Sequence, residues 1–486
     1  MTVNRQVVFG AVVALFVSMA SGTGATESLE DVLSGFDDGG SKQVEQVATD
    51  SFEDVLSGFD DGAGAKERQS REGEEAEGRG VPPWLQPFGS LALKTTWNLA
   101  HDAPAQGEAD FRGLSMARTT LRLGADLKFD DWQARITGHG FYDAGYTVNG
   151  RDQYGAALLD DSEQELEIDE LYLQGSLSPR FDYKVGHQIV VWGKSDNLRV
   201  TDILNPIDNR MPGLVDVKDL RLPVTMTRLD YYLGDWNLSG IMIHEVRFNL
   251  NPVYPSDFLP GDTPQPPEQE IDDFSLDHQQ FGLAVNGIFS GWDLSFYGAE
   301  IYDPRGHVEG VDGASKQLAH NRVAMTGLSI NSALGSWLLK GEAAWWDGLE
   351  YGGVTDRDFS RVDLMAGVEY TGFAETVLSL EIVNRHIFEY DPALLNAPDT
   401  VRRDSLQTVA KLVRDFANDT IQLKILLSLL GSNGRDGAFE RFQLDYDLTD
   451  DVTLTGGVIF YQSGDLGLFS DADDNDRLFF EVTFGF

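Results

Sequence analysis

The last ten residues of the sequence constrain the fold more than any other stretch. They read RLFFEVTFGF, from Arg477 to Phe486, and apolar positions alternate with mixed ones. A period of two residues is that of a β-strand with one apolar face. The apolar face comprises Leu478, Phe480, Val482, Phe484 and Phe486. A strand with lipid on one side and a wet lumen on the other fits this pattern, so we expect a transmembrane β-barrel.

The same terminal pattern resembles the insertion signal of Gram-negative outer-membrane barrels. The resemblance implies that an assembly machinery in the outer membrane reads Phe480, Val482, Phe484 and Phe486. It also implies that outer-membrane lipid and lipopolysaccharide surround the folded chain. We therefore expect Phe486→Asp to impair assembly more than a loop deletion does.

Further alternating segments along the chain can supply the other strands. We count eighteen, with sixteen as the neighbouring possibility, and therefore predict an all-β, up-and-down antiparallel barrel over 81–486. The predicted strands are 88–99, 115–129, 131–143, 164–177, 180–192, 223–233, 235–247, 278–289, 291–302, 321–332, 335–347, 359–371, 375–388, 404–417, 418–430, 437–448, 450–462 and 476–486.

Short and long connections alternate along most of this region. An even number of strands places both ends of the barrel on the rim that carries the short turns, which faces the periplasm in such barrels. Four tight turns are each followed by a tryptophan of outward parity, and these are Trp132, Trp236, Trp292 and Trp337. Tryptophan repeated at one depth is typical of the aromatic girdle at a water–lipid boundary.

The N-terminal region predicts export. Residues 1–25 have Arg5 as their only charge, then an apolar run and small residues, as a secretory signal does. The chain has no cysteine, so a stable exported fold must come from closed strand pairing instead of disulfides. Its formal charge of −42 argues against nucleic acid as a partner.

Residues 26–80 form an acidic, largely disordered segment that we expect in the periplasm. ESLEDVLSGFDDG at 27–39 recurs as DSFEDVLSGFDDG at 50–62. Each copy predicts a very short amphipathic helix, too short to persist alone. The repeats are either a plain spacer or two docking peptides for a periplasmic partner. The docking residues would be Leu29, Val32, Leu33, Phe36, Phe52, Val55, Leu56 and Phe59.

The inward parity of the predicted strands carries charges of both signs. An eighteen-stranded barrel leaves an aqueous lumen, and charged walls can select solutes. The same charges can simply pair with one another and keep the interior wet. The candidate pore-lining residues are Arg118, Arg122, Arg135, Lys184, Gln188, Arg228, Lys340, Glu342, Arg361 and Asp363.

The connection 193–222 is long, rich in charges of both signs and interrupted by three prolines. A loop of this length needs a reason. It either folds inward and narrows the pore or lies outside, stabilised by surface ion pairs. The candidate constriction residues are Lys194, Asp196, Arg199, Asp202, Asn205, Pro206, Asp208 and Arg210.

The run GHQIVVWGKSDNLRVTDILNPIDNR at 186–210 resembles the signature of the DUF1302 family of proteobacterial outer-membrane barrels. The short LEDVLSGFDD element is similar to one in the same group. The resemblance implies an outer-membrane location and a transport role, and it implies no substrate and no catalytic residue. The matching positions are Gly186, Gln188, Trp192, Gly193, Lys194, Asp202, Asn205, Pro206 and Asp208.

No nucleophile elbow, zinc-protease helix, P-loop or C-x-x-C motif occurs, so we expect no enzyme, no cofactor and no bound metal. The predicted function is a porin-like channel for small solutes, narrowed by loop 193–222. The alternative is a conduit or anchor of a multi-component transport system that binds a periplasmic partner through the repeats. A barrel enzyme whose site is assembled from separate strands is a third possibility.

Overall fold

The computed structural model describes most of the chain that follows the acidic segment. The described residues are 82–259, 266–310, 316–396, 398–465, 469 and 472–486. The predicted signal segment and the two repeats lie outside them. Among the described residues, none of the helices has the length and apolar character needed to cross a membrane.

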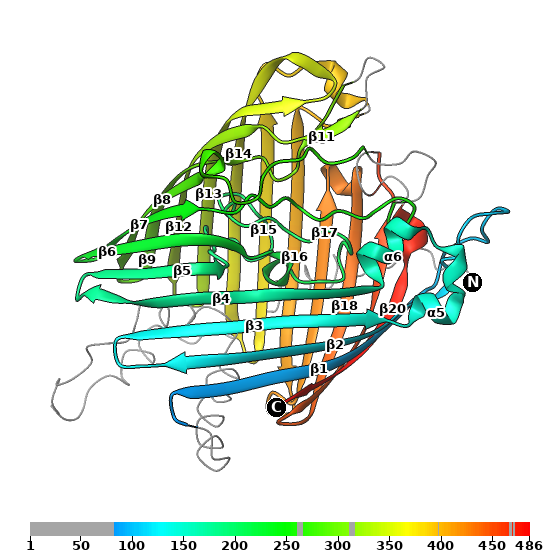
Figure 1. Ribbon diagram of the computed structural model, residues 1–486, viewed down its shortest axis with the longest axis horizontal. Helices are drawn as coiled ribbons and strands as arrows, with labels where there is room; N and C mark the ends of the chain where they lie inside the picture. Colours follow the sequence, from blue (N-terminus) through cyan, green and yellow to red (C-terminus); the bar gives the residue numbers. More distant parts are fainter. Residues whose placement is uncertain (1–81, 260–265, 311–315, 397, 466–468, 470–471) are drawn as a thin grey trace, which may run out of the picture. The chain divides into compact units, whose positions relative to one another are not determined.

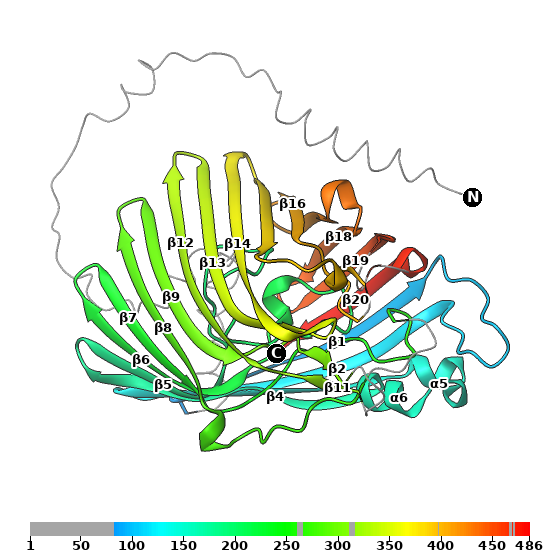
Figure 2. The same ribbon diagram turned by 90° about the horizontal axis from the view of Figure 1, so that it is seen from above.

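Eighteen antiparallel strands form one closed sheet, as the alternation predicts (Figures 1 and 2). The strands of the barrel are β1 (Leu85–Asn98), β2 (Gly113–Lys128), β3 (Trp132–Asp143), β4 (Gln164–Ser178), β5 (Phe181–Gln188), β6 (Val224–Leu233), β7 (Trp236–Ile243), β8 (Gln280–Phe289), β9 (Trp292–Tyr302), β12 (Arg322–Leu334), β13 (Trp337–Tyr351), β14 (Val354–Phe373), β15 (Thr376–Ile387), β16 (Asp404–Phe416), β17 (Ile421–Leu430), β18 (Gly437–Thr449), β19 (Val452–Gln462) and β20 (Arg477–Gly485).

Shorter elements occupy the connections. β10 (His307–Glu309) and β11 (Gln317–Ala319) form a separate two-stranded sheet in the connection between β9 and β12, which the sequence does not predict. The helices are α5 (Gly145–Asn149), α6 (Ala156–Ser162), η1 (Arg151–Gln153), η2 (Val217–Leu220), η3 (Leu276–His278), η4 (Pro392–Leu395), η5 (Ser432–Gly434) and η7 (Ala472–Asn475).

The first and last strands close the barrel. β20 pairs antiparallel with β1 from Ser90 opposite Gly485 to Asn98 opposite Arg477. Gly89 and Phe486 exchange two backbone hydrogen bonds of 2.9 Å beyond the last of these pairs. Closure leaves the sheet without an exposed edge at this junction, which a barrel in lipid requires.

Hairpin turns and both ends of the barrel share one edge of the sheet, here called the turn rim. The opposite edge, the loop rim, carries the longer connections. The predicted strands 335–347 and 359–371 end too far apart, because β13 and β14 extend toward each other and meet in a turn at Gly352 and Gly353. The Asp399 carboxylate accepts hydrogen bonds from both glycine N–H groups and fixes this turn.

The outer face of the barrel is apolar and aromatic. Trp132, Trp292 and Trp337 lie at the turn rim, and each stacks or packs on a neighbouring ring across a turn or strand. Trp236 packs edge-on against Phe289 at the same level. On β20 the apolar face points outward, and Phe480, Phe484 and Phe486 are exposed. The predicted girdle and lipid-facing strand thus lie where lipid would contact them.

β5 is shorter than the predicted 180–192, because the chain leaves the barrel wall after Gln188. Gly186 adopts φ +133°, and a Cβ there would lie 2.2 Å from the carbonyl oxygen of Leu171. Only glycine fits such a close approach. The residues that follow, 189–223, turn into the barrel, and we call them the inner loop.

Candidate constriction loop and charged lumen wall

The two ends of the inner loop are held together at the barrel wall by Asn205, which is fully buried. Its Oδ1 accepts a hydrogen bond from the Val190 N–H at 2.8 Å. Its Nδ2 donates to the carbonyls of Gln188 and Leu222. Gln188 in turn donates to the Met226 carbonyl at 3.1 Å. Asn205 therefore divides the loop into a first half, 189–205, and a second half, 206–223.

The first half reaches two carboxylates on the far strands. Glu342 of β13 accepts hydrogen bonds from the N–H groups of Lys194 and Ser195, at 2.5 and 2.7 Å. It also accepts from the N–H and hydroxyl of Thr201, at 3.1 and 2.8 Å. Bonds to a charged acceptor are roughly twice as strong as neutral ones. One buried carboxylate thus fixes two stretches of the loop to the opposite wall.

Glu381 of β15 does the same for the next residues. It accepts hydrogen bonds from the Ser195 hydroxyl at 2.8 Å and from the N–H groups of Asp196 and Asn197 at 3.1 and 3.0 Å. Asp196 also pairs with Lys340 of β13. Buried charge is costly unless it is paired or hydrogen-bonded, so these partners explain why two glutamates persist inside the barrel.

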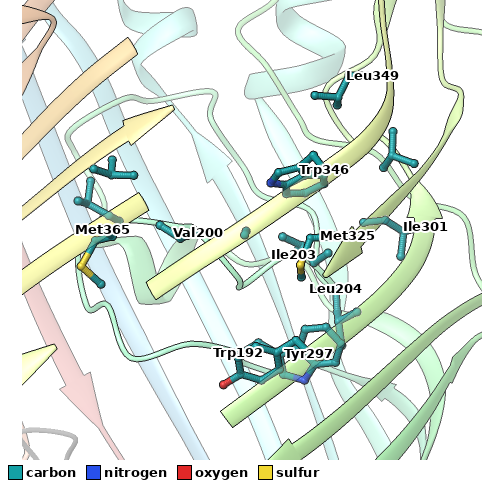
Figure 3. Packing of buried hydrophobic residues seen from close by; sticks show 14 of the residues in the cluster. Trp192, Val200, Ile203, Leu204, Tyr297, Ile301, Met325, Trp346, Leu349 and Met365 are labelled. Carbon is teal, nitrogen blue, oxygen red and sulfur yellow. The ribbon is translucent and has the colours of Figure 1, made fainter. Parts of the chain in front are cut away.

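Apolar packing completes the attachment of the first half (Figure 3). Trp192 stacks on Tyr297 of β9 with ring centroids 4.9 Å apart. Gly193 has φ +89°, and a Cβ there would lie 2.7 Å from the Glu342 carboxylate. The loop side chains in this cluster are Val190, Trp192, Leu198, Val200, Ile203 and Leu204, and they pack against inward residues of β6–β9 and β12–β16. The barrel therefore contains a hydrophobic core between the loop and half of its own wall.

The second half crosses to the last strands. The Tyr461 hydroxyl of β19 donates to the Pro212 carbonyl at 2.6 Å. Arg441 of β18 pairs with Asp216 and donates to the Gly213 carbonyl at 3.3 Å. Leu214 is buried in a second cluster with side chains of β19 and β20. The second half of the inner loop thus contacts β18, β19 and β20 before the chain returns to β6.

Ion pairs stiffen the loop itself. Asp202 lies between Arg199 and Arg221, at 3.1 and 2.8 Å. Arg210 contacts Asp208 at 2.7 Å and also reaches Glu165 of β4 at 2.8 Å. Burial alone would lower the pKa of Arg210, but hydrogen bonds to Asp208 outweigh it and raise the pKa. Arg210 therefore stays charged at physiological pH.

The ten predicted pore-lining residues all lie on the inner face, in two different surroundings. Under the first half, Lys340, Glu342, Arg361 and Asp363 are buried, and the Arg361 and Asp363 side chains pair at 2.7 Å. Gln188 is fully buried at the base of the loop. These five residues therefore hold structure together and do not border open solvent.

The other wall, formed by β1–β4 and β20, is more open. The Arg122 side chain is 53 % exposed although it lies 3.0 Å from Asp169. Arg135 pairs with Asp126 at 2.6 Å, and Arg118 lies over the Phe141 ring and 3.6 Å from Asp143. The next two strands carry the remaining candidates. Lys184 of β5 lies over the Tyr172 ring, and Arg228 of β6 pairs with Asp230 of the same strand at 2.8 Å.

The predicted constriction residues divide in the same way. Lys194, Asp196, Arg199, Asp202 and Asn205 belong to the first half, and Lys194 pairs with Asp293 of β9 at 3.6 Å. Pro206, Asp208 and Arg210 begin the second half, where the Pro206 carbonyl accepts from the Leu222 N–H. Four wall residues anchor the loop. Glu381 and Arg441 are charged residues that inward parity places in the lumen, whereas Tyr297 and Tyr461 are absent from the predicted residues. Inward parity marks such positions, but it does not identify the loop as their partner.

A small polar cavity lies beside the second half. It has a volume of about 50 Å³ and is lined in part by Arg118, Asp161, Arg210, Asp257 and Arg477. A space of this size can hold one or a few water molecules. Burial raises the pKa of Asp161, which lies 3.7 Å from Arg210. The cavity thus places several charged side chains around a space that water can occupy.

Among the described residues, His139, Glu165 and Glu167 have ligand atoms within 4.8 Å of one another, as a metal site would. Glu165 and Glu167 are already paired with Arg210 and Arg247, at 2.8 and 2.5 Å. His139 bridges Asp169 and Glu165, at 2.6 and 3.3 Å. The arginines neutralise these carboxylates, so the geometry fits an ion-pair network better than a cation site.

The chain is similar to several solved structures. The OccAB4 structure from Acinetobacter baumannii has a TM-score of 0.48 and 12 % identity, covering 82 % of this chain and 98 % of that one. OccD3 (OpdP) from Pseudomonas aeruginosa has a TM-score of 0.48 and 9 % identity, covering 82 % and 91 %. OpdK with vanillate, from the same organism, has a TM-score of 0.46 and 10 % identity, covering 82 % and 98 %.

No curated protein matches the sequence. A family model does match, over residues 64–486, and it includes the whole barrel and the 186–210 signature that the sequence singles out. The chain therefore belongs to the DUF1302 family, which is described as a family of proteins of unknown function.

Proposed function

We propose that the protein is an outer-membrane channel for small solutes whose passage is narrowed by the inner loop. The observation that carries the proposal is the attachment of residues 194–201 to Glu342 and Glu381 on the opposite wall. An eighteen-stranded barrel has an interior too wide for wall side chains alone to fill, so a loop fixed across it sets the size of the passage.

The charged wall supports the same proposal. Arg122, Asp169 and their neighbours on β2–β4 provide a polar surface opposite the apolar core, and a hydrated solute needs such a surface. In this proposal the solute passes between the first half of the inner loop and the charged inner face of β1–β4. The apolar wall is occupied by the loop and serves as its support.

Planar-bilayer recording of the purified full-length protein tests the proposal. We expect stepwise conductance that is smaller than that of an unobstructed barrel of eighteen strands. A correctly folded barrel that inserts and never conducts would contradict it. Folding is checked independently by the heat-dependent shift in gel migration that closed outer-membrane barrels show.

The repeats at 27–39 and 50–62 favour a second function, a conduit or anchor coupled to a periplasmic partner. They lie in the segment that we expect in the periplasm, together with the turn rim. Deletion of residues 27–62 separates the two functions. Unchanged conductance and unchanged solute uptake in cells would show that the repeats are dispensable, whereas loss of uptake alone would support the coupled function.

A further inference from the structure

One stretch of the barrel wall lacks a partner strand. β5 pairs with β4 only from His187 opposite Leu171 to Phe181 opposite Ser178. β4 continues towards the loop rim for seven more residues, 164–170, which pair with β3 alone. Figure 1 shows β4 running past the end of β5. Among the described residues, no strand is hydrogen-bonded to the other edge of this stretch, which we call the seam.

Side chains close the seam in place of a backbone ladder. Glu165 lies 2.8 Å from Arg210 of the inner loop. Glu167 lies 2.5 Å from Arg247, whose guanidinium also donates to the Pro223 carbonyl at 3.2 Å. Both cations are long and flexible, and both come from loops. Displacing them breaks no backbone pairing of the barrel.

The seam lies at the depth of the membrane. Leu166 and Ile168 point outward from it, with 91 % and 50 % of their surface exposed. Leu166 pairs with Gly140, two residues before the outward-facing Tyr142 on β3, whose hydroxyl contacts Thr147 at the loop rim. An aromatic ring with its polar tip toward the water marks the outer boundary of the apolar band. Leu166 therefore belongs to the lipid-facing surface.

An open sheet edge is not tolerated in the hydrocarbon region unless it is covered or borders a water-filled space. The seam is an edge of this kind, with lipid on the side of Leu166 and Ile168. Its other side is the lumen, where Glu165, Glu167 and Asp169 face inward with His139. The wall between lumen and membrane is held there by two ion pairs.

We propose that the seam is a lateral portal through which an amphipathic molecule with one anionic head group exchanges between lumen and outer leaflet. A carboxylate or phosphate head replaces Glu165 or Glu167 on Arg210 and Arg247, since guanidinium binds both groups bidentately. The apolar tail lies along Leu166 and Ile168. The proposal rests on the proposed function in that the lumen must hold such a solute, and it adds the route and the solute class.

Photo-crosslinking in nanodiscs tests the portal. A long-chain carboxylic acid with a diazirine in its acyl chain is loaded into the bilayer around the full-length protein and then activated. Mass spectrometry compares two sets of inward-facing residues. One set lies on β4 around Glu167, and the other lies on β1 and β20 around Lys94 and Glu481. Lateral entry predicts labelling concentrated at the seam. Equal labelling of both places, or none in the lumen, would overturn the proposal.

Variants of the Glu167–Arg247 ion pair test the portal further. Glu167→Gln should raise seam labelling by roughly ten-fold, because the partly buried pair that holds the closed state is lost while Arg247 stays available to the head group. Arg247→Ala also breaks this pair but removes one partner of the head group, so it should raise labelling less, and Arg247→Lys should stay near the wild-type level. Arg402→Ala is the matched control, since Arg402 joins outer loops through Asp436 and Asp465 away from the seam. Wild-type levels of seam labelling in both Glu167→Gln and Arg247→Ala would contradict the portal.

Two further measurements show whether the head-group class, the portal or the axial channel is at fault if the expected labelling is not seen. A diazirine alcohol of equal chain length should label the seam less than the acid does, and equal labelling would overturn the anionic head group. Conductance is recorded for the same preparations. Normal conductance without seam labelling refutes the portal and leaves the channel intact, whereas seam labelling without conductance supports the portal and refutes the axial channel.

Discussion

The two sides of the lumen differ in what their inward residues contact. From β6 to β16 the inner face is largely apolar near the loop rim and packs against the first half of the inner loop, as in the core of a soluble protein. On β1–β4 and β20 the inner face carries paired charges, some of them partly exposed, such as Arg122 and Asp169. One side therefore holds the constriction, and the other borders the passage. The predictions below test this division.

Both sides of the lumen exist only in a closed barrel. The largest loss of assembled protein is therefore expected from a change in the closing strand, β20. Phe486→Asp places a charge on the lipid face of the end of β20, beside the two hydrogen bonds to Gly89. A charge on the lipid face of a barrel costs up to a few kcal/mol, depending on depth. We expect a severe loss of outer-membrane protein, measured by immunoblotting of membrane fractions. Leu276→Asp in an outer loop is the control, and near-normal levels of the Phe486 variant would refute the role of this strand.

The next effect belongs to the apolar side. Trp192→Ala removes the ring that stacks on Tyr297 and should cost about 3–5 kcal/mol of local stability, because a cavity remains in a packed core. We expect limited proteolysis to cleave the inner loop in the variant and to spare it in the wild type. Trp345→Ala removes an outward ring of strand β13 and should leave the loop protected. Equal protection in both variants would argue against a core inside the barrel.

A smaller effect is expected on the charged side. Arg122→Ala removes one exposed cation, whose interaction with an ion about 4–8 Å away in water is worth ~0.5–1 kcal/mol. Ion permeability ratios should shift toward cations by roughly two- to five-fold, as measured by reversal potentials under a salt gradient. Arg414→Ala, at the outer face of β16, should change nothing. The same shift in both variants would mean that the passage does not follow the charged wall.

The smallest effect concerns the second half of the loop. Tyr461→Phe removes the hydrogen bond to the Pro212 carbonyl and nothing else, a change worth about 1 kcal/mol. Conductance should keep its mean value and show more frequent fluctuations in single-channel records. A noise level unchanged from wild type would indicate that Arg441 and the apolar contacts of Leu214 suffice to hold this half.

Alternation along the chain was enough to predict the barrel, because each strand buries or exposes its residues by local parity alone. The eighteen predicted strands and the outward tryptophans follow from that rule. The early end of β5 could not be predicted in this way, since Val190 and Trp192 continue the apolar pattern inside the lumen. The same residues fit a strand in the wall and a loop in the core.

The partners of the inner loop were also beyond the reach of the sequence. Glu342 is an inward charge by parity, but its contact with the N–H of Lys194 joins residues 148 apart in the chain. Backbone donors carry no sequence signal, so a carboxylate that binds them looks like any other lumen charge. The 186–210 signature did mark the site, and the structure gives a physical reason for Gly186, Gln188, Gly193 and Asn205.

Single-channel conductance of the double variant Glu342→Ala, Glu381→Ala tests the central claim most directly. Removing both carboxylates releases residues 194–201 from β13 and β15, so the loop should leave the passage at least part of the time. We predict a larger conductance than that of the wild type in the same bilayer, with Glu300→Ala on the outer face as the unchanged control. A double variant that folds and conducts as the wild type does would show that the inner loop does not set the size of the passage.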